Sequence, residues 1–245
     1  MRTPGRTFVL LLLIGTCLAL VMPNAVIAQP PVGQPQQDPN TDSAGKPLPG
    51  TSIPCAPIGE KRQELGCYVL VRQQLRALPH SSPVSWHLDA FANRSSAEAA
   101  KSEHGFVVEV FDRVWLFTIA APNWRPSGAG EHVATVGPLP LATGTAQYTA
   151  MYLASTFRPG FSSFVHAHPG PEAWFTLSGQ GCLETPEGRM SGRAGEGMVI
   201  RGDLPMIVRA TGSEIRRNFT LILHDSAKAA TTRVDDWKPA GLCAN

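Results

Sequence analysis

Residues 160–179 read GFSSFVHAHPGPEAWFTLSG, and they hold more side chains suited to site chemistry than any other part of the sequence. In a strand over residues 162–168, the side chains of His166 and His168 share one face, because side-chain direction repeats every second residue. The Pro-Gly-Pro sequence that follows predicts a chain reversal. We therefore expect Glu172 to open the next strand with its carboxylate beside the two imidazoles.

Two neutral imidazoles and one carboxylate are ligands that suit a divalent transition metal. Two histidines and one carboxylate with open coordination positions are the ligand set of non-haem iron oxygenases. The residue types do not distinguish Fe, Mn, Zn, Ni or Cu. The stretch thus predicts one divalent metal, held by His166, His168 and Glu172.

The spacing of five residues in this stretch resembles the first signature of the cupin family, G-x5-H-x-H-x3-E-x6-G. The fixed positions are Gly160, His166, His168, Glu172 and Gly179. The resemblance covers the region from about residue 145 to residue 225 and implies a mainly β fold, a double-stranded β-helix or jelly-roll barrel. It also implies a homodimer that pairs through outer strands, and a small-molecule ligand or substrate.

The family's second signature, which usually ends in Pro-x-Gly-x2-His, is altered in this chain. Its best match is IRGDLPMIVRA at residues 200–210, where Met206 occupies the position of the histidine. Met206 either offers a thioether sulfur as a fourth ligand or fills the cavity floor, and packing is the simpler interpretation. Other histidines lack a partner at metal-ligand spacing, and we interpret them as surface residues: His80, His87, His104, His132 and His224.

Short apolar runs punctuated by glycine and proline predict the strands of the barrel. They lie at residues 145–154, 181–184, 197–201, 205–210 and 217–224. We expect the barrel and a C-terminal tail to occupy residues 141–245.

Residues 55–140 predict a β/α extension that packs on the barrel as an added layer. Strand-forming residues are concentrated at 67–71, 84–91 and 105–119. A short helix is expected at 95–103, capped by Ser95 or Ser96. The Gly/Pro-rich residues 122–143 predict a long connection that covers part of the cavity mouth.

The N-terminus has the pattern of a secretory signal peptide over residues 1–28. Arg2 and Arg6 precede an apolar run, and Ala28 ends a small-residue cleavage motif. The apolar run is shorter than the roughly 18 to 20 residues that a membrane span needs. We therefore expect an exported protein, periplasmic or extracellular, without a stable membrane span. A lipoprotein modified at Cys17 is the alternative, although Thr16 is a poor residue before such a cysteine.

Residues 29–54 are rich in proline and glutamine and predict a disordered tether, because they cannot bury enough apolar surface to offset chain ordering. The net charge of the whole chain is +2 and its basic residues do not cluster, so nothing indicates a nucleic-acid partner.

Four cysteines remain after signal removal, and an oxidising compartment favours two disulfides over free thiols. Cys55 and Cys67 are the best local pair because a short loop separates them. Cys182 and Cys243 then pair by elimination, out of three connectivities that the sequence leaves open. Buried free thiols are the other interpretation.

The resemblance does not name a reaction, because cupins include dioxygenases, isomerases, decarboxylases, storage proteins and sugar sensors. Three protein ligands leave positions open on a metal, which favours a metal-dependent dioxygenase or isomerase acting on a small polar molecule. A non-catalytic module that binds or senses a small ligand is the alternative. A metal-free structural barrel is a third hypothesis.

Overall fold

The strands β7 (Tyr148–Phe157) and β14 (Arg216–Asp225) pair along their whole length at the centre of a six-stranded sheet. The computed structural model describes residues 55–59, 65–75, 78–79 and 81–243. The expected signal peptide, most of the tether and His80 lie outside these residues. The remaining strands of this sheet, whose order is β1-β2-β7-β14-β9-β12, are β1 (Ala56–Pro57), β2 (Gly66–Leu75), β9 (Glu172–Ser178) and β12 (Gly197–Ile200).

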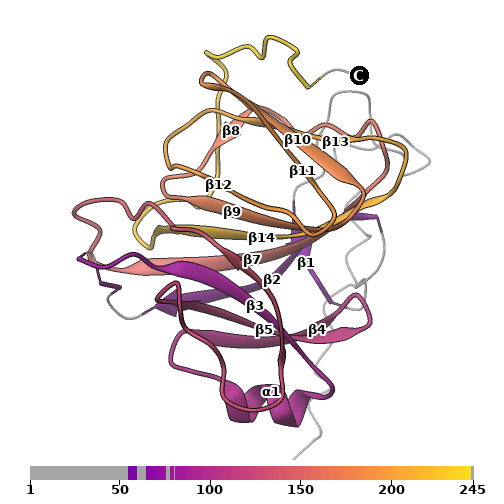
Figure 1. The fold of residues 1–245 in the computed structure, drawn as a ribbon. Helices are drawn as coiled ribbons and strands as arrows, with labels where there is room; N and C mark the ends of the chain where they lie inside the picture. Colours follow the sequence, from indigo (N-terminus) through magenta and orange to yellow (C-terminus); the bar gives the residue numbers. More distant parts are fainter. Residues whose placement is uncertain (1–54, 60–64, 76–77, 80, 244–245) are drawn as a thin grey trace, which may run out of the picture. The chain divides into compact units, whose positions relative to one another are not determined.

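A second, three-stranded sheet completes the barrel (Figure 1). It has the order β11-β10-β13, formed by β11 (Gly188–Arg193), β10 (Gln180–Thr185) and β13 (Ile207–Thr211). The strands β8 (His166–Ala167) and β15 (Thr232–Arg233) pair in a two-stranded ribbon. Figure 1 shows β8 on the same side of the six-stranded sheet as β10. The architecture is the mainly β, cupin-like double-stranded β-helix that the signature predicts.

The extension forms a four-stranded sheet on the opposite side of the six-stranded sheet (Figure 1). Its order is β4-β5-β3-β6, with β4 (Gly105–Val110), β5 (Arg113–Ala120), β3 (Ser85–Phe91) and β6 (Glu131–Val136). The expectation for residues 122–143 was wrong, because this stretch contains β6 and does not line the large cavity of the barrel. The strands β1 and β2 also pair within the barrel sheet rather than within the extension.

The helix α1 (Arg94–Ala100) is shorter than expected and has a different cap. The side chain of Asn93, and not that of Ser95 or Ser96, occupies the N-cap position. Its Oδ1 accepts a hydrogen bond from the amide of Ser96 at 2.9 Å. An asparagine with extended backbone satisfies one of the amides that a helix start leaves without a partner, which places the helix start one residue earlier.

All ten residues of β7 are buried, although a strand in a two-layer barrel would expose one face. Tyr152 packs in the core shared with the extension, whereas Met151 and Leu153 face the inside of the barrel. The same division holds on β14, where Leu221 faces the extension and Ile222 faces the barrel interior. The six-stranded sheet is therefore the middle of three layers, and its apolar alternation fills both of its faces.

Aromatic side chains fill the interface between the extension and the six-stranded sheet. The ring centroids of Phe117 and Phe219 lie 4.9 Å apart in an edge-on arrangement, and those of Trp115 and Phe219 lie 5.0 Å apart. Trp86 packs against Phe117 at 5.5 Å. Edge-to-face pairs at this spacing add about 0.5–1.5 kcal/mol beyond the burial of their area. The extension is thus part of the folded core.

A hydrogen-bonded cluster in the extension corrects the interpretation of His87 as a surface residue, whereas His104 and His132 are partly exposed. His87 is fully buried, and its Nε2 lies 2.9 Å from the carbonyl of Ala121. The Nδ1 of His132 lies 2.8 Å from the buried carboxylate of Asp89, and Thr135 bridges the two rings. Burial lowers the pKa of His87 and raises that of Asp89. The network therefore gives each of these four side chains at least one hydrogen-bond partner, while the Oδ2 of Asp89 has none.

Two cysteine pairs lie at disulfide distance. The sulfur atoms of Cys55 and Cys67 are 1.90 Å apart, and those of Cys182 and Cys243 are 1.92 Å apart. Both pairs fit the expected pairing.

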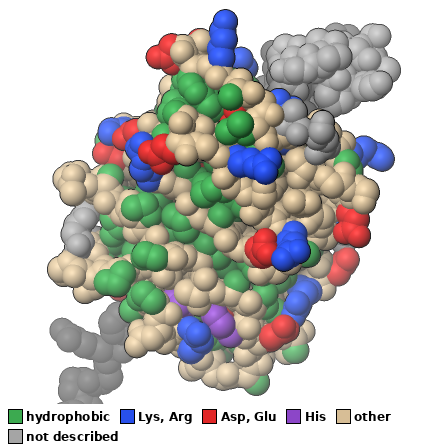
Figure 2. Space-filling model, turned by 45° about the horizontal axis from the view of Figure 1, so that its top comes forward, with side chains coloured by type: hydrophobic (Ala, Val, Ile, Leu, Met, Phe, Trp, Pro, Cys, Tyr) green, Lys and Arg blue, Asp and Glu red, His purple; other side chains and the backbone are tan. Residues whose placement is uncertain are grey.

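None of the helices in the described ranges is long and apolar enough to cross a membrane. Figure 2 shows acidic and basic side chains intermixed on the face in view.

Removing each disulfide should lower the melting temperature by an amount that follows loop length. Cys182 and Cys243 are 61 residues apart and Cys55 and Cys67 are 12 apart. Chain-entropy arguments give about 4 kcal/mol for the first loop and about 3 kcal/mol for the second. Paired cysteine-to-alanine variants measured by thermal denaturation test this order. Four reactive thiols in the denatured, unreduced mature protein would contradict the pairing.

Candidate functional site

The segment before the candidate ligands is extended but only partly a strand. Sequence alternation predicts a strand over 162–168, whereas the paired strand β8 covers only His166–Ala167. The amide of Ser163 donates to the carbonyl of Val208 at 2.8 Å, and the backbones of His166 and Met206 exchange two hydrogen bonds of 2.8 and 3.0 Å. These few bonds keep the alternation, so His166 and His168 both line the barrel cavity.

Two glycines, Gly179 of the signature and Gly170 within it, turn the chain where a side chain has no room. Gly179 has a φ of 67°, and a Cβ on it would lie 2.8 Å from the Cα of Arg216. A Cβ on Gly170, in the turn after His168, would lie 2.1 Å from the carbonyl oxygen of Leu223. Only glycine tolerates such close approach of two backbones. The two turns therefore fix β9 against β14 and bring Glu172 to the cavity.

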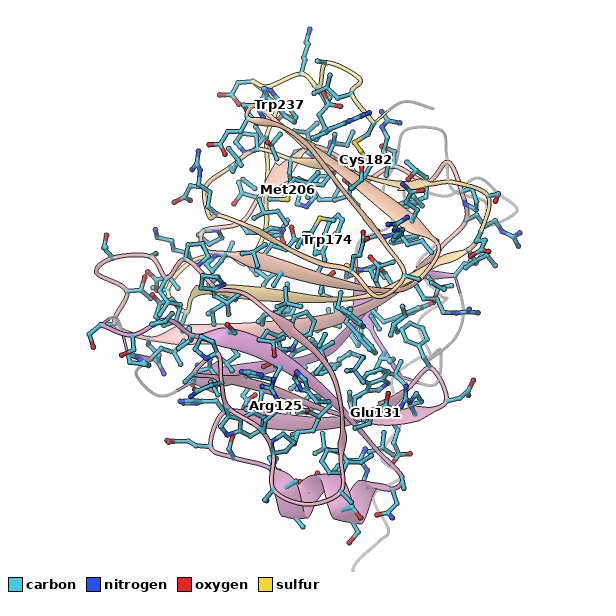
Figure 3. All side chains as sticks on the ribbon, in the orientation of Figure 1. Arg125, Glu131, Trp174, Cys182, Met206 and Trp237 are labelled. Carbon is cyan, nitrogen blue, oxygen red and sulfur yellow. A yellow bond between two sulfur atoms is a disulfide. The ribbon has the colours of Figure 1, made fainter. Side chains whose placement is uncertain are left out.

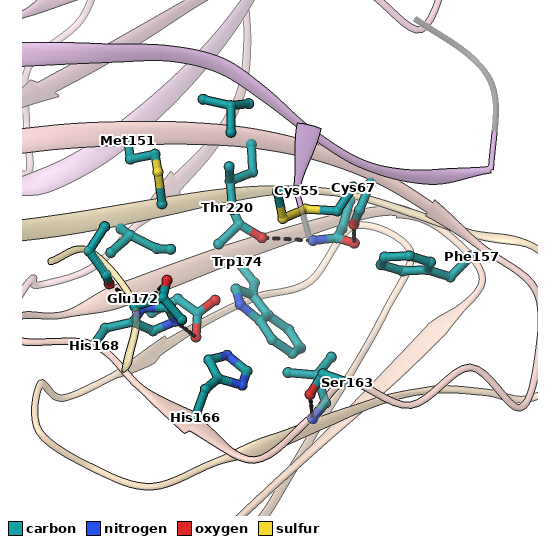
Figure 4. Close-up of a pocket in the computed structure, with 18 of the residues that line it drawn as sticks. Cys55, Cys67, Met151, Phe157, Ser163, His166, His168, Glu172, Trp174 and Thr220 are labelled. Carbon is teal, nitrogen blue, oxygen red and sulfur yellow. Dashed lines mark hydrogen bonds and ion pairs between the residues drawn. A yellow bond between two sulfur atoms is a disulfide. The ribbon is translucent and has the colours of Figure 1, made fainter. Parts of the chain in front are cut away.

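The predicted ligands meet at one end of this cavity (Figure 4). The ring centroids of His166 and His168 are 5.0 Å apart. The Nε2 of His168 lies 3.8 Å from the Oε2 of Glu172. All three residues are buried. The sequence thus identified side chains that the fold brings together from β8, the following turn and β9.

Backbone carbonyls fix the tautomer of both rings. The Nδ1 of His166 lies 2.9 Å from the carbonyl oxygen of Phe164, and the Nδ1 of His168 lies 2.6 Å from that of Ala230. A carbonyl oxygen only accepts hydrogen bonds, so each Nδ1 carries the proton and each Nε2 carries the lone pair. The same arrangement orients histidines that bind metals.

Burial keeps these rings neutral. It lowers the pKa of His168 from 6.5 to about 4, and it lowers the pKa of His166, to which the neighbouring His168 contributes. Burial also raises the pKa of Glu172, an effect that the positive charge of Arg216 opposes. Neutral imidazoles near pH 7 are the form that binds metals.

The donor chemistry fits a divalent metal, although the donors are not yet close together. The Nε2 of His168 and the Oε2 of Glu172 are buried without a hydrogen-bond partner. No three His, Cys, Asp or Glu side chains among the residues that the structure describes are grouped closely enough to hold an ion. Binding would therefore require these side chains to move toward one another.

Met206 packs in the core and does not line the cavity. It is 1% exposed and clusters with Trp174, Leu183 and Leu204. Figure 3 shows Met206 and Trp174 in the space between β9 and the three-stranded sheet. This position supports the packing interpretation of Met206.

His224 is the residue near the site that sequence reasoning misplaced. It is buried, not on the surface, and its charge would oppose protonation of His168. Its Nδ1 lies 2.8 Å from the carbonyl of Asp225, and its Nε2 has no hydrogen-bond partner. It lines a second cavity that shares Arg72 and Ala230 with the main one. Its position two residues after Ile222 on β14 could have indicated this inward direction.

The main cavity has a volume of about 390 Å³ and extends along β14 away from the candidate ligands. Its walls are mostly apolar, and Phe157 and Phe161 stack at 3.7 Å on one side. The charged residues among its lining are Arg72, Glu172 and Arg216. A small, largely apolar molecule therefore fits the space.

No family model matches the chain, and no curated protein matches it. Similar solved structures include an uncharacterized conserved protein with a double-stranded β-helix domain from Klebsiella pneumoniae, at 16% identity and a TM-score of 0.32. That match covers 41% of this chain and 80% of the other. A DMSP lyase from Ruegeria pomeroyi has 16% identity and a TM-score of 0.31, with coverages of 35% and 43%.

Oxalate oxidase in complex with the substrate analogue glycolate has 19% identity and a TM-score of 0.30. The match covers 36% of this chain and 46% of the oxidase, so this chain spans less than half the length of the oxidase, as it does for the lyase. The class of the protein follows from its own architecture. Facing sheets with the signature residues on their inner side define a cupin-like barrel.

Acidification should destabilise the metal-free protein through His168. The pKa of His168 is about 4 in the folded protein and 6.5 in the unfolded chain. The stability that the neutral ring contributes is therefore fully present above pH 6.5 and is lost as pH falls toward 4. Between about pH 7 and pH 5 the free energy of unfolding should fall by about 2 kcal/mol from this ring. Urea denaturation at several pH values measures it. In His168→Gln the free energy of unfolding should depend less on pH, whereas the control His104→Gln should keep the dependence of the wild type. Equal pH dependence in the two variants would contradict the assignment of this effect to His168.

Proposed function

We propose that the protein is an exported, cupin-like barrel protein that binds one divalent metal through His166, His168 and Glu172. The observation that supports this most is the pair of imidazoles whose Nδ1 atoms donate to backbone carbonyls. The Nε2 of His168 lies 3.8 Å from the Oε2 of Glu172, and all three side chains line the same cavity. A metal-dependent reaction on a small molecule, an oxidation or an isomerisation, is the activity we infer.

When bound, such a metal would act as a Lewis acid that polarises oxygen atoms of a substrate. The chain's own residues prepare the site for it. The carbonyls of Phe164 and Ala230 hold the two rings in the tautomer that leaves Nε2 free. The apolar walls near Phe157 and Phe161 exclude water from the substrate. Glu172 supplies the negative charge that partly neutralises a cation.

A non-catalytic role in binding or sensing a small ligand is the second candidate. It is favoured by the packing of Met206 in the core, since this position carries a histidine in the family signature. With fewer ligands the site holds a metal less firmly, whereas the cavity for an organic molecule remains.

Export is proposed from the signal-peptide pattern, and the two cysteine pairs at disulfide distance support it. Expression in a secreting host should yield a mature chain that begins at Gln29, and intact-mass measurement checks the cleavage site. A chain that keeps its first 28 residues in the cytosol would contradict export.

Metal binding should disappear when either imidazole is removed. The wild type should bind about one equivalent of a divalent ion, whereas His166→Ala and His168→Ala should bind less than about a tenth of that, because two donors hold an ion poorly. Elemental analysis after dialysis measures the content. His104→Ala, a half-exposed histidine in the extension, is the matched control. Equal metal content in all four proteins would reject the site.

Met206→His separates a ligand position from a packing position. Because Met206 packs in the core, the new polar ring should cost about 1–3 kcal/mol of stability without raising metal affinity. Chemical denaturation and a chelator titration measure the two quantities. Tighter metal retention in the variant would show that residue 206 reaches the ion.

A further inference from the structure

Arg216, the first residue of β14, carries a buried guanidinium at the cavity. It is 1% exposed, and its Cζ lies 4.5 Å from the ring centroid of Trp174. Gly181 leaves room for it, because a Cβ there would lie 2.6 Å from the arginine Nε. The neighbouring strands thus provide space for a cation inside a mostly apolar cavity.

This guanidinium lacks the partners that buried charges require. Its Nε and Nη2 are buried without a hydrogen bond. Glu172 is the acidic residue whose charge acts on it, yet among the described residues the two side chains form no ion pair. A buried charge without a partner is strongly unfavourable, so its presence indicates a ligand that completes the site.

The two free nitrogens lie on one edge of the guanidinium. Nε–H and Nη2–H point in parallel, and this fork matches the two oxygens of a planar carboxylate. A phosphate would have further oxygens, for which the nearby polar groups offer little. Ser155 donates to Asn218 at 2.5 Å, and Asn218 donates to Thr220 at 2.9 Å, so these groups already bond to one another.

The two ends of the cavity differ in what they can bind. Arg216 and Asn218 lie at the end beside the Cys55–Cys67 pair, because Asn218, Ser155 and Cys67 are successive cross-strand partners. Glu172 pairs with Ile222 toward the other end. Between them lie Leu153 and Trp174, the two cross-strand partners of Thr220. A ligand that spans the cavity therefore needs an apolar body.

We propose that the cavity binds a monocarboxylate with an apolar body, and that Arg216 holds its carboxylate through Nε and Nη2. This inference rests on the proposed small-molecule function of the cavity and specifies its ligand class. Arg216 sets specificity for the anion, whereas His166, His168 and Glu172 lie toward the opposite end of the ligand.

Calorimetric titration of metal-free protein with 3-phenylpropanoate and octanoate, each beside its primary amide, tests the proposal. Both acids should bind at least about tenfold more tightly than their amides. The amide offers the guanidinium only one neutral carbonyl oxygen, and its NH2 group cannot accept the second hydrogen bond. If neither acid is preferred over its amide, or neither acid binds, the proposal is overturned.

Arg216→Met should weaken acid binding by about 10- to 100-fold and leave amide binding nearly unchanged. Arg217→Met is the matched control, since its side chain points to the other face of β14. Should the methionine variant not fold, Arg216→Lys keeps the charge and loses the fork, and it must reduce the ratio of acid to amide affinity. An unchanged ratio in either variant overturns the proposal.

The same proteins distinguish this inference from the metal assignment. Arg216→Met should retain the metal content of the wild type, whereas His166→Ala should lose metal and keep its preference for the acids. Failure of the metal assignment would leave the acid preference intact in metal-free protein. Failure of the carboxylate inference would leave metal content intact.

Discussion

The burial of the six-stranded sheet on both faces is the constraint on which the rest of the structure depends. Residues such as Tyr152 and Leu221 pack against the extension, and Met151 and Ile222 face the cavity. Because aromatic packing against the extension buries one face of the sheet, the core does not depend on the other face, which can carry polar side chains. The extension supplies that closure, which lets β14 carry Arg216, Asn218 and Thr220 inward without losing the core.

At the candidate site, backbone groups fix the orientation and the tautomer of the side chains. The carbonyls of Phe164 and Ala230 set the tautomers of His166 and His168, and glycine turns place Glu172 beside them. The Nε and Nη2 of Arg216, in contrast, have no hydrogen-bond partner. The cavity thus has unpartnered atoms of His168 and Glu172 at one end and unpartnered guanidinium nitrogens at the other.

Much of the barrel could be predicted from the sequence, because its strands have clear apolar alternation and its signature residues stand at fixed spacing. The shared direction of His166 and His168 followed from alternation alone, even though the paired strand there is only two residues long. Strand β6 was missed because Gly/Pro-rich flanks concealed it. The burial of His87 and Arg216 could not be predicted, since it depends on which layers cover each strand, whereas the inward direction of His224 follows the alternation of β14.

The carbonyl that orients His168 comes from Ala230, 62 residues further along the chain. Residues Thr232–Arg233 then pair with β8, and Cys243 lies at disulfide distance from β10. Residues 230–233 are thus part of the wall behind the candidate ligands, and Cys243 ties the following segment to the barrel. As the chain emerges during synthesis, the barrel strands precede residues 230–243, so the ring of His168 gains the carbonyl that orients it only after all the strands of both barrel sheets have been made.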